Sequence, residues 1–229
     1  NMAWPDSNRN AIVADYEYVP QLKTSPYLHS KELLKDIVDD MKAQDLSPII
    51  SYELTRGCPY TCTFCDWNSG FGNKTTRRKE SYKDEIDLFQ ELGVTGLFLA
   101  DANLGQYQED VDMVEYFADR NINHGTKFKL DYTVSKLRKD NNLKIFHSMA
   151  KANLCTHFVI SVQDTNDQVL EYIDRPDVGW DVHRKHITAL AKEYPHIPSV
   201  VQIIQGLPGQ TVDSFRKSLL DVVSVHAMP

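Results

Sequence analysis

Five short apolar segments alternate with amphipathic segments after residue 48, and this alternation constrains the fold more than any other feature of the sequence. The apolar segments have the length of β-strands, and the amphipathic segments carry apolar residues at helical spacing. A helix between two strands brings the second strand back parallel to the first, and right-handed crossovers curl such a sheet toward a barrel. We therefore expect an α/β fold with a parallel sheet. The expected strands are Ile49–Leu54, Gly96–Ala100, Phe128–Tyr132, Phe158–Val162 and Val200–Ile204.

The expected helices follow these strands in turn, and Thr211 is placed to cap the last of them. They cover Ser81–Leu92, Glu109–Arg120, Leu143–Ala152, Gln168–Ile173, Val182–Tyr194 and Val212–Val225. Residues 1–48 form an expected N-terminal extension and linker. It contains a weak strand pattern at Ala11–Val19, a linker-like stretch at Gln21–Pro26 and a short helix at Ser30–Met41. Residues 49–229 form the expected core, which ends directly after a helix and is expected to be truncated at its C-terminus.

Charge and composition exclude several classes of protein. The chain has 229 residues, with 25 Lys and Arg against 32 Asp and Glu, and this net charge of -7 argues against general nucleic-acid binding. No apolar run is long enough to cross a membrane, and the first residues lack the pattern of a signal peptide. The 4 cysteines are too few for a disulfide framework. We expect a soluble, cytoplasmic protein with reduced thiols.

Three cysteines lie close together directly after the first expected strand. Cys58, Cys62 and Cys65 can wrap one metal centre, since thiolates are soft ligands for zinc or iron–sulfur clusters. A structural zinc site takes four ligands, but the fourth cysteine, Cys155, is distant in sequence, and no histidine lies in the loop. Three thiolates leave one iron of a [4Fe–4S] cluster open for chemistry. Zinc binding, or burial as small apolar residues, remains the alternative.

The C-x-x-x-C-x-x-C pattern after the first strand of a parallel barrel resembles the motif of the radical S-adenosylmethionine (radical SAM) superfamily. The resemblance implies that Cys58, Cys62 and Cys65 hold three irons of a [4Fe–4S] cluster, while S-adenosylmethionine (SAM) chelates the fourth. It implies that Phe64 lies beside the adenine. Reductive cleavage of SAM then gives a 5′-deoxyadenosyl radical that abstracts hydrogen. The implied fold is a partial parallel (β/α) barrel, a partial TIM barrel, with five of about six strand–helix units present.

The segment after the second strand is similar to the one that contacts the SAM amino group in this family. Asp101 and Asn103 stand where the family often has a Gly-Gly-Glu run, and either side chain is expected to take over that contact. The alternative is an ordinary strand-end turn, for which Asp and Asn are common residues.

Two later segments also resemble the family. Ser161 and Gln163 match the fourth-strand residues that meet the SAM ribose or carboxylate, and Arg175 matches an arginine near the carboxylate. Gly206 and Leu207 belong to a Gly-Leu-Pro-Gly segment that runs under the adenine in the family. For Arg175 the alternative is a position at a helix end or in water.

The run Arg56–Trp67 looks most like radical SAM proteins that also carry an N-terminal cobalamin-binding domain. The residues before the core are too few for such a domain, so cobalamin is expected only in a longer parent chain. Peptide epimerases share this style of cysteine loop. In such enzymes a free cysteine returns the hydrogen atom, which makes Cys155 a candidate catalytic residue by analogy, with burial in the core as the alternative.

The sequence therefore predicts a radical SAM enzyme that acts on a small-molecule or peptide substrate, with a flavodoxin or ferredoxin as reductant. Methyl transfer, epimerisation and sulfur insertion all remain open as reaction subclasses. The alternative function is a non-catalytic zinc- or iron–sulfur-binding scaffold fragment.

Overall fold

The computed structural model describes residues 24–67, 74–78, 82–175 and 178–225, together with the backbone of two short strands near the N-terminus. These strands, β1 (Ala3–Pro5) and β2 (Ala11–Val13), pair antiparallel. The strand expected over Ala11–Val19 is thus confirmed for its first three residues. The rest of that range, Ser81 at the start of an expected helix, and the end of the chain lie outside the described residues.

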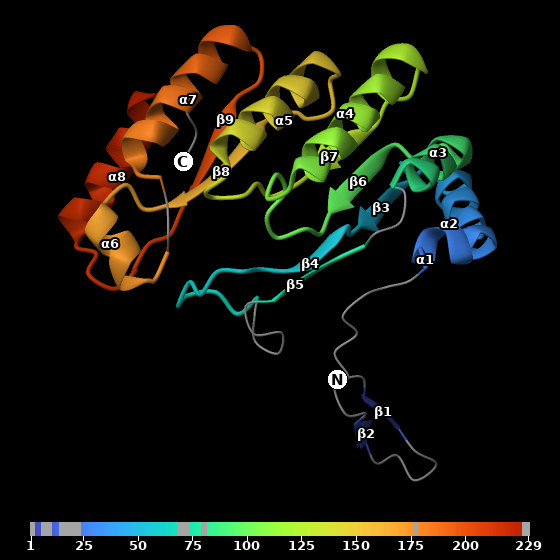
Figure 1. Ribbon diagram of the computed structural model, residues 1–229, viewed down its shortest axis with the longest axis horizontal. Helices are drawn as coiled ribbons and strands as arrows, with labels where there is room; N and C mark the ends of the chain where they lie inside the picture. The colour runs from blue at the N-terminus through green and yellow to red at the C-terminus, as the bar shows by residue number, and fades with distance from the viewer. Residues whose placement is uncertain are drawn as a thin grey trace.

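Five parallel strands form the centre of the molecule, in two hydrogen-bonded groups. The first group has the order β3 (Ile49–Tyr52), β6 (Gly96–Leu99) and β7 (Lys129–Asp131). The second group pairs β8 (Phe158–Gln163) with β9 (Ser199–Ile203). The groups meet where the Leu130 N–H donates to the Leu154 carbonyl oxygen at 2.7 Å. Figure 1 shows the strands following one another across the molecule, which confirms the expected parallel α/β fold.

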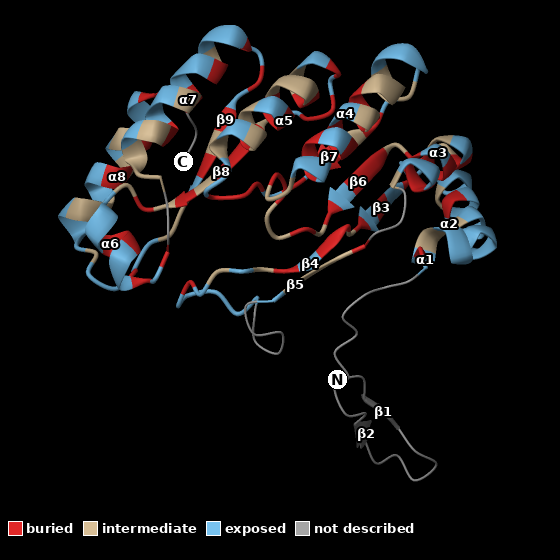
Figure 2. Ribbon diagram, viewed as in Figure 1, coloured by how far each residue is buried: buried red, intermediate tan, exposed pale blue. Residues whose placement is uncertain are grey.

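Helices cover one face of this sheet (Figure 1). In β3, Ile50 is buried, whereas the Ile49 side chain, on the other face, is 58% exposed. The other strands alternate less regularly, and β8 begins with three buried residues (Figure 2). The helices are α1 (Pro26–His29), α2 (Lys31–Ala43), α3 (Tyr82–Leu92), α4 (Gln108–Asn123), α5 (Lys139–Lys151), α6 (Asp167–Tyr172), α7 (Trp180–Glu193) and α8 (Val212–Ser224). Apart from α1, which was not predicted, they confirm the expected helices, with boundaries that differ by a few residues.

The apolar core lies between this face of the sheet and the helices. Phe128, the residue before β7, packs edge-on against Phe117 of α4, with ring centroids 5.3 Å apart. Phe158 of β8 packs against Phe146 of α5 at 5.1 Å. Burial of these aromatic side chains supplies much of the hydrophobic stabilisation. The opposite, inner face of the sheet is left to a cavity described below.

The main difference from the expected fold is a two-stranded hairpin after β3, where the sequence predicted only a loop. Strand β4 (Thr55–Gly57) pairs antiparallel with β5 (Thr75–Arg77). These strands are short and polar, so no alternation of apolar residues in the sequence predicts them. Gly57 adopts φ of +89°, and a Cβ there would lie 2.1 Å from the Lys74 carbonyl oxygen. Only glycine fits at this close approach of the two strands.

A buried ion pair joins this hairpin to the rest of the fold. Arg78, directly after β5, pairs with Glu85 of α3, and its Nη2 donates to Glu85 Oε2 at 2.9 Å. Glu85 also accepts a hydrogen bond from the Tyr52 hydroxyl at 2.6 Å and another from Ser25. Removal of one member of such a pair typically costs about 3–5 kcal/mol, because the other charge stays buried.

The same network also holds Ser25 and Tyr27, at the end of the N-terminal segment, against the core. Ser25 is buried and caps α1, and the Arg78 guanidinium lies 5.4 Å from the ring centroid of Tyr27. The linker expected over Gln21–Pro26 therefore ends in a packed helix cap at Ser25. The boundary at residue 48 stays a prediction.

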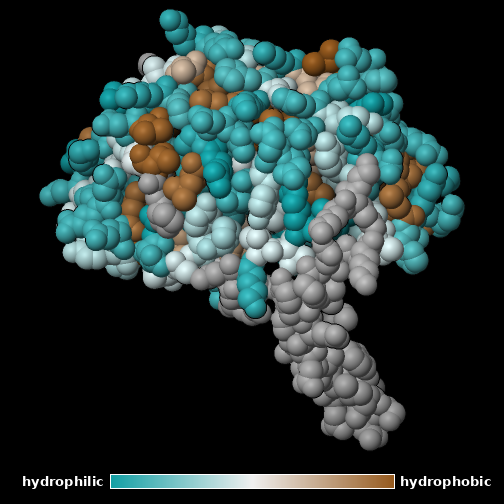
Figure 3. All heavy atoms as spheres, in the orientation of Figure 1, coloured by the Kyte–Doolittle hydropathy of each residue, from teal (hydrophilic) through white to brown (hydrophobic). Residues whose placement is uncertain are grey.

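The face drawn in Figure 3 is mostly hydrophilic, with separate hydrophobic patches. Among the exposed apolar side chains are those of Leu33 on α2 and Val212 and Leu220 on α8. Within the described part of the chain, no helix combines the length and apolar character needed to span a membrane.

The turn between β9 and α8 contains two glycines with positive φ, Gly206 at +86° and Gly209 at +78°. A Cβ on Gly209 would lie 2.3 Å from a ring carbon of Tyr172, whereas a Cβ on Gly206 would meet no atom within 4 Å. After the turn, Thr211 accepts a hydrogen bond from the Ser214 N–H and caps α8, as expected. The turn therefore packs tightly against α6 at only one of its two glycines.

We predict that Gly209→Ala destabilises the protein more than Gly206→Ala. Both substitutions place a side chain at positive φ, which costs about 1–2 kcal/mol. Gly209→Ala must also displace the Tyr172 ring; because this side chain is 57% exposed, the added cost should lie at or below the lower end of the ~1–3 kcal/mol for overpacking a core. Urea unfolding of the two variants measures the difference in the free energy of unfolding. Equal losses would contradict the close packing of this turn on Tyr172.

Candidate functional site

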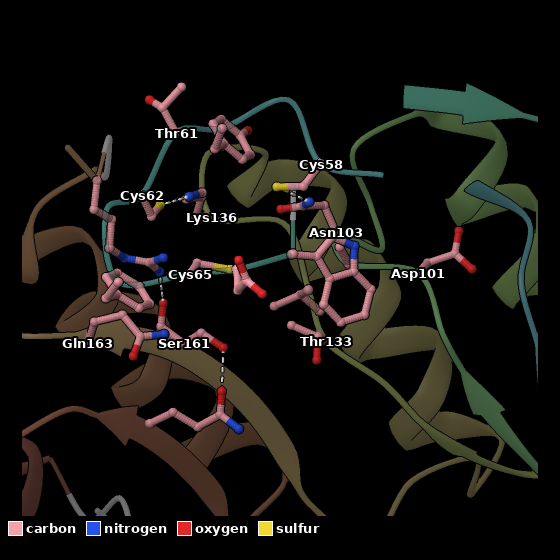
Figure 4. Close-up of a pocket in the computed structure, with 18 of the residues that line it drawn as sticks. Cys58, Thr61, Cys62, Cys65, Asp101, Asn103, Thr133, Lys136, Ser161 and Gln163 are labelled. Atoms are coloured by element: carbon pink, nitrogen blue, oxygen red, sulfur yellow. Dashed lines mark hydrogen bonds between the residues drawn. The ribbon is translucent and has the colours of Figure 1, made fainter. Parts of the chain in front are cut away.

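The three cysteines of the loop after β4 line one cavity of about 630 Å³. Cys58 is half-buried, Cys62 is buried and Cys65 is exposed. Figure 4 shows the three side chains around the same space. The structure thus brings together the three residues that the sequence predicted as metal ligands. The cavity lies beyond the carboxyl ends of the parallel strands, where α/β proteins place their active sites.

Neighbouring elements fix the shape of the cysteine loop. Inside the loop, the Cys65 N–H donates to the Cys62 carbonyl oxygen at 3.0 Å. Toward α6, the Thr63 N–H donates to the Ile173 carbonyl oxygen at 2.9 Å, and the Thr61 hydroxyl donates to Asp174. The loop therefore depends on contacts with a segment more than a hundred residues away in sequence.

Two N–H donors contact the cysteine sulfurs. Asn103 Nδ2 donates to Cys58 Sγ at 3.1 Å, and Lys136 Nζ donates to Cys62 Sγ at 2.7 Å. In metal sites, donors of this kind orient the sulfur ligand and compensate the negative charge of a metal-bound thiolate. Asn103 was predicted as a contact for the SAM amino group. In the structure, Asn103 lines the cavity, and its amide N–H contacts the Cys58 sulfur.

Asp101 holds the start of the hairpin. The Leu54 N–H donates to Oδ2 at 2.9 Å and the Thr55 N–H donates to Oδ1 at 2.6 Å. Burial raises the pKa of the Asp101 carboxyl, which is only 4% exposed, to about 6. Figure 4 shows its carboxyl turned away from the cysteines. Asp101 also lines the cavity, so its contact with the SAM amino group stays a prediction beside the strand-end alternative.

Ser161, Gln163 and Arg175 all line the cavity, together with Phe64. Ser161 Oγ donates to Gln202 Oε1 at 2.5 Å, and Arg175 Nη2 donates to the Ser161 carbonyl oxygen. Gln163 has φ of +73° at an irregularity in the pairing of β8 with β9. Such bulges commonly re-aim a side chain next to an active site. Arg175 is buried, which excludes a position in bulk water.

Three other predicted site residues lie outside this cavity. Gly206 and Leu207 do not line it, and Leu207 packs in a small second core with residues of α6. Cys155 is buried and lines a separate cavity of about 410 Å³. Burial raises the pKa of the Cys155 thiol to about 11. The position of Cys155 favours the core alternative, and the roles predicted for Gly206 and Leu207 stay predictions.

Several lining residues were not predicted from the sequence: Phe98, Thr133, Lys136 and Gln202. Thr133 and Lys136 follow β7, the third strand of the parallel series. Because the ends of parallel strands meet at one edge, the loop after this strand could have been singled out by its position alone. Gln202 lies inside β9, and no local signal marks it.

The donor set fits an iron–sulfur cluster better than a single ion. Among the described residues, no three His, Cys, Asp or Glu side chains converge closely enough to hold one metal ion. A single zinc needs all its thiolates about 2.3 Å from one point. A cluster takes one thiolate on each of several irons, so three thiols spread around a roomy cavity suit it.

The fold and the site define an α/β protein with a partial parallel barrel and a three-cysteine loop at the carboxyl ends of its strands. Residues 52–222 match the radical SAM superfamily, and this match covers well over half of the chain. The chain belongs to the radical SAM superfamily.

Two similar curated proteins are methyltransferases. The chain is 31% identical over 204 residues to the cobalamin-dependent radical SAM methyltransferase TokK of Streptomyces tokunonensis, covering 88% of this chain and 29% of TokK. It is 32% identical over 196 residues to 2-(S-pantetheinyl)-carbapenam-3-carboxylate methyltransferase of Streptantibioticus cattleyicolor, covering 85% of this chain and 28% of that protein. The chain thus spans less than a third of the length of these relatives.

A solved structure agrees with the fold. The crystal structure of Streptococcus suis SuiB bound to precursor peptide SuiA superposes with a TM-score of 0.54 at 13% identity. The superposition covers 94% of this chain and 46% of SuiB. At this identity the likeness supports the barrel architecture alone.

We predict that Cys155 reacts far more slowly with iodoacetamide than Cys65 in the folded, metal-free protein at pH 7.5. The thiolate is the reactive form, and a pKa of about 11 leaves fewer than about 1 in 1,000 Cys155 thiols ionised at this pH. Peptide mass spectrometry after a short alkylation measures both rates. The urea-unfolded protein, in which the two rates should approach each other, is the control. Equal rates in the folded protein would contradict the buried position of Cys155.

Proposed function

We propose that this chain is the catalytic core of a radical SAM enzyme, which binds one [4Fe–4S] cluster and SAM and abstracts hydrogen from a substrate still to be identified. The observation that carries the proposal is the gathering of Cys58, Cys62 and Cys65 around one cavity of about 630 Å³. This volume lies within the range of cofactor and ligand pockets. The three thiolates leave one iron of the cluster without a protein ligand.

The residues around the cavity have separate roles in this proposal. Cys58, Cys62 and Cys65 each hold one iron. When both are bound, the reduced cluster would supply an electron and SAM would supply the sulfonium C–S bond, whose cleavage gives methionine and a 5′-deoxyadenosyl radical. Phe64 offers a partly exposed aromatic face to the adenine.

Polar lining residues orient SAM in the proposal. The planar guanidinium of Arg175 suits the SAM carboxylate, since it can donate two parallel hydrogen bonds. Ser161 and Gln163 offer polar groups to the ribose. Asn103 keeps an amide oxygen that can accept from the SAM amino group. Gly206 and Leu207 would act from beneath the adenine only through the backbone.

Among the reaction subclasses, methyl transfer has the most support, because the two similar curated proteins named above are methyltransferases. Both a peptide and a small molecule stay among the candidate substrates. In a methyltransferase of this type, cobalamin would be held by a part of the protein outside these 229 residues. We further propose a cytoplasmic setting and a flavodoxin or ferredoxin as the electron donor.

The alternative is a zinc- or iron–sulfur-binding scaffold without activity. The absence of a convergent single-ion site among the described residues argues against zinc. A redox-inactive scaffold also gives no reason for Phe64, Gln163 and Arg175 to line the same cavity as the cysteines.

We predict that the anaerobically reconstituted protein, reduced with dithionite, converts SAM to 5′-deoxyadenosine and methionine. Loss of an outer-shell partner typically costs ~10–100-fold, so loss of a cluster ligand in Cys58→Ala, Cys62→Ala or Cys65→Ala should lower the rate by at least about 100-fold. Liquid chromatography with mass spectrometry measures both products.

Cys155→Ala is the matched control, because it removes a cysteine outside the cavity. It should cleave SAM at the rate of the unmodified protein. If the protein binds iron but cleaves no SAM, the result would contradict the enzymatic proposal and favour the scaffold alternative. Stoichiometric zinc that resists replacement by iron would contradict the proposal outright.

A further inference from the structure

A lysine lies against one of the cluster cysteines. Lys136 follows β7 at the carboxyl edge of the sheet, and its Nζ is 2.7 Å from Cys62 Sγ. Lys136 is only 7% exposed and Cys62 only 8% exposed. Figure 4 shows the dashed contact between them at the side of the cavity. A positive charge and a metal-binding sulfur therefore meet largely out of contact with bulk water.

The surrounding structure holds this lysine in place. Ser135, the preceding residue, is fully buried, and its N–H donates to the Leu104 carbonyl oxygen at 2.8 Å. On the other side, Lys136 Nζ lies 4.0 Å from the centroid of the Tyr60 ring. The Tyr60 and Ser135 hydroxyls both donate to Gln106 Oε1, at 3.1 Å and 2.9 Å. One amide thus fixes both the aromatic ring and the backbone segment that carries the lysine.

Among the residues that the structure describes, no carboxylate pairs with the charge of Lys136. Its polar contact there is the Cys62 sulfur, and its other neighbour is an aromatic face. A buried ammonium is costly unless a negative group compensates it. A thiolate bound to a cluster is such a group, so the position of Lys136 is explained by a negatively charged centre in the cavity.

We propose that Lys136 raises the reduction potential of the cluster. The inference rests on the proposed function, because it requires a cluster on Cys62. Reduction adds one electron from the donor to the cluster, and the extra negative charge is stabilised by a nearby positive charge and an N–H···S hydrogen bond. The effect is strengthened by the low effective dielectric of a buried site. Asn103 adds a neutral donor to Cys58. Lys136 is thus a positioning and tuning residue that makes the cluster easier to reduce.

The test is a redox titration of the reconstituted protein without SAM, in which electron paramagnetic resonance measures the reduced fraction at each potential. Lys136→Met removes the charge and the donor but keeps the length of the side chain. We expect about a tenfold lower ratio of reduced to oxidised cluster at a given potential, which corresponds to a midpoint about 59 mV more negative for a one-electron couple. Lys136→Arg keeps the charge and should stay close to the unmodified protein.

Lys144→Met is the matched control, because it removes an exposed lysine from α5. Its midpoint should not move. If Lys136→Met loses iron, the midpoint potential is measured in Lys136→Gln instead. This variant keeps an N–H donor, so its midpoint potential should shift less, in the same direction.

An unchanged midpoint potential in Lys136→Met with full iron content would overturn the inference. Where Lys136→Met loses iron, an unchanged midpoint potential in Lys136→Gln would overturn it. An equal shift in Lys136→Arg and Lys136→Met would overturn it as well. Absence of a cluster from the unmodified protein would instead contradict the proposed function, so the two failures are distinguishable.

Discussion

The site depends on how a loop with little regular structure is anchored at its start and in its middle. Its first end leaves β4 at Gly57, where the approach of the Lys74 carbonyl leaves no room for a side chain. Asp101 ties the base of the hairpin to the sheet through two backbone N–H groups. Hydrogen bonds to the end of α6 hold the middle of the loop. Three separate parts of the fold therefore set the positions of the three thiols.

The one-sided burial of the sheet creates the space that the loop closes. Helices cover the outer face, and the aromatic contacts between α4, α5 and the strands stabilise it. The inner face carries polar side chains such as Ser161 and Gln202, which line the cavity beside the cysteines. The architecture therefore separates stability from chemistry: the apolar core lies on one side of the strands, and the groups that can orient a ligand lie on the other.

Local sequence patterns predicted the regular part of this fold and the centre of the site. Apolar periodicity was enough for the five strands and their helices, because each signal lies within one element. The spacing of Cys58, Cys62 and Cys65 was enough to predict that their thiols gather at one place. The β4–β5 hairpin, the backbone contacts of Asp101 and the approach of Lys136 to Cys62 were not predictable in the same way. Each of them joins residues far apart in sequence, and no pattern within a single segment encodes such a contact.

The proposed chemistry requires a cluster that is held by three cysteines and has one iron open to SAM. The decisive experiment is electron paramagnetic resonance of the anaerobically reconstituted and reduced protein, recorded with and without SAM. We expect a [4Fe–4S] signal whose g values shift when SAM is added, because SAM ligates the open iron. A cluster signal indifferent to SAM, or a protein that holds zinc and no iron, would contradict the proposed function.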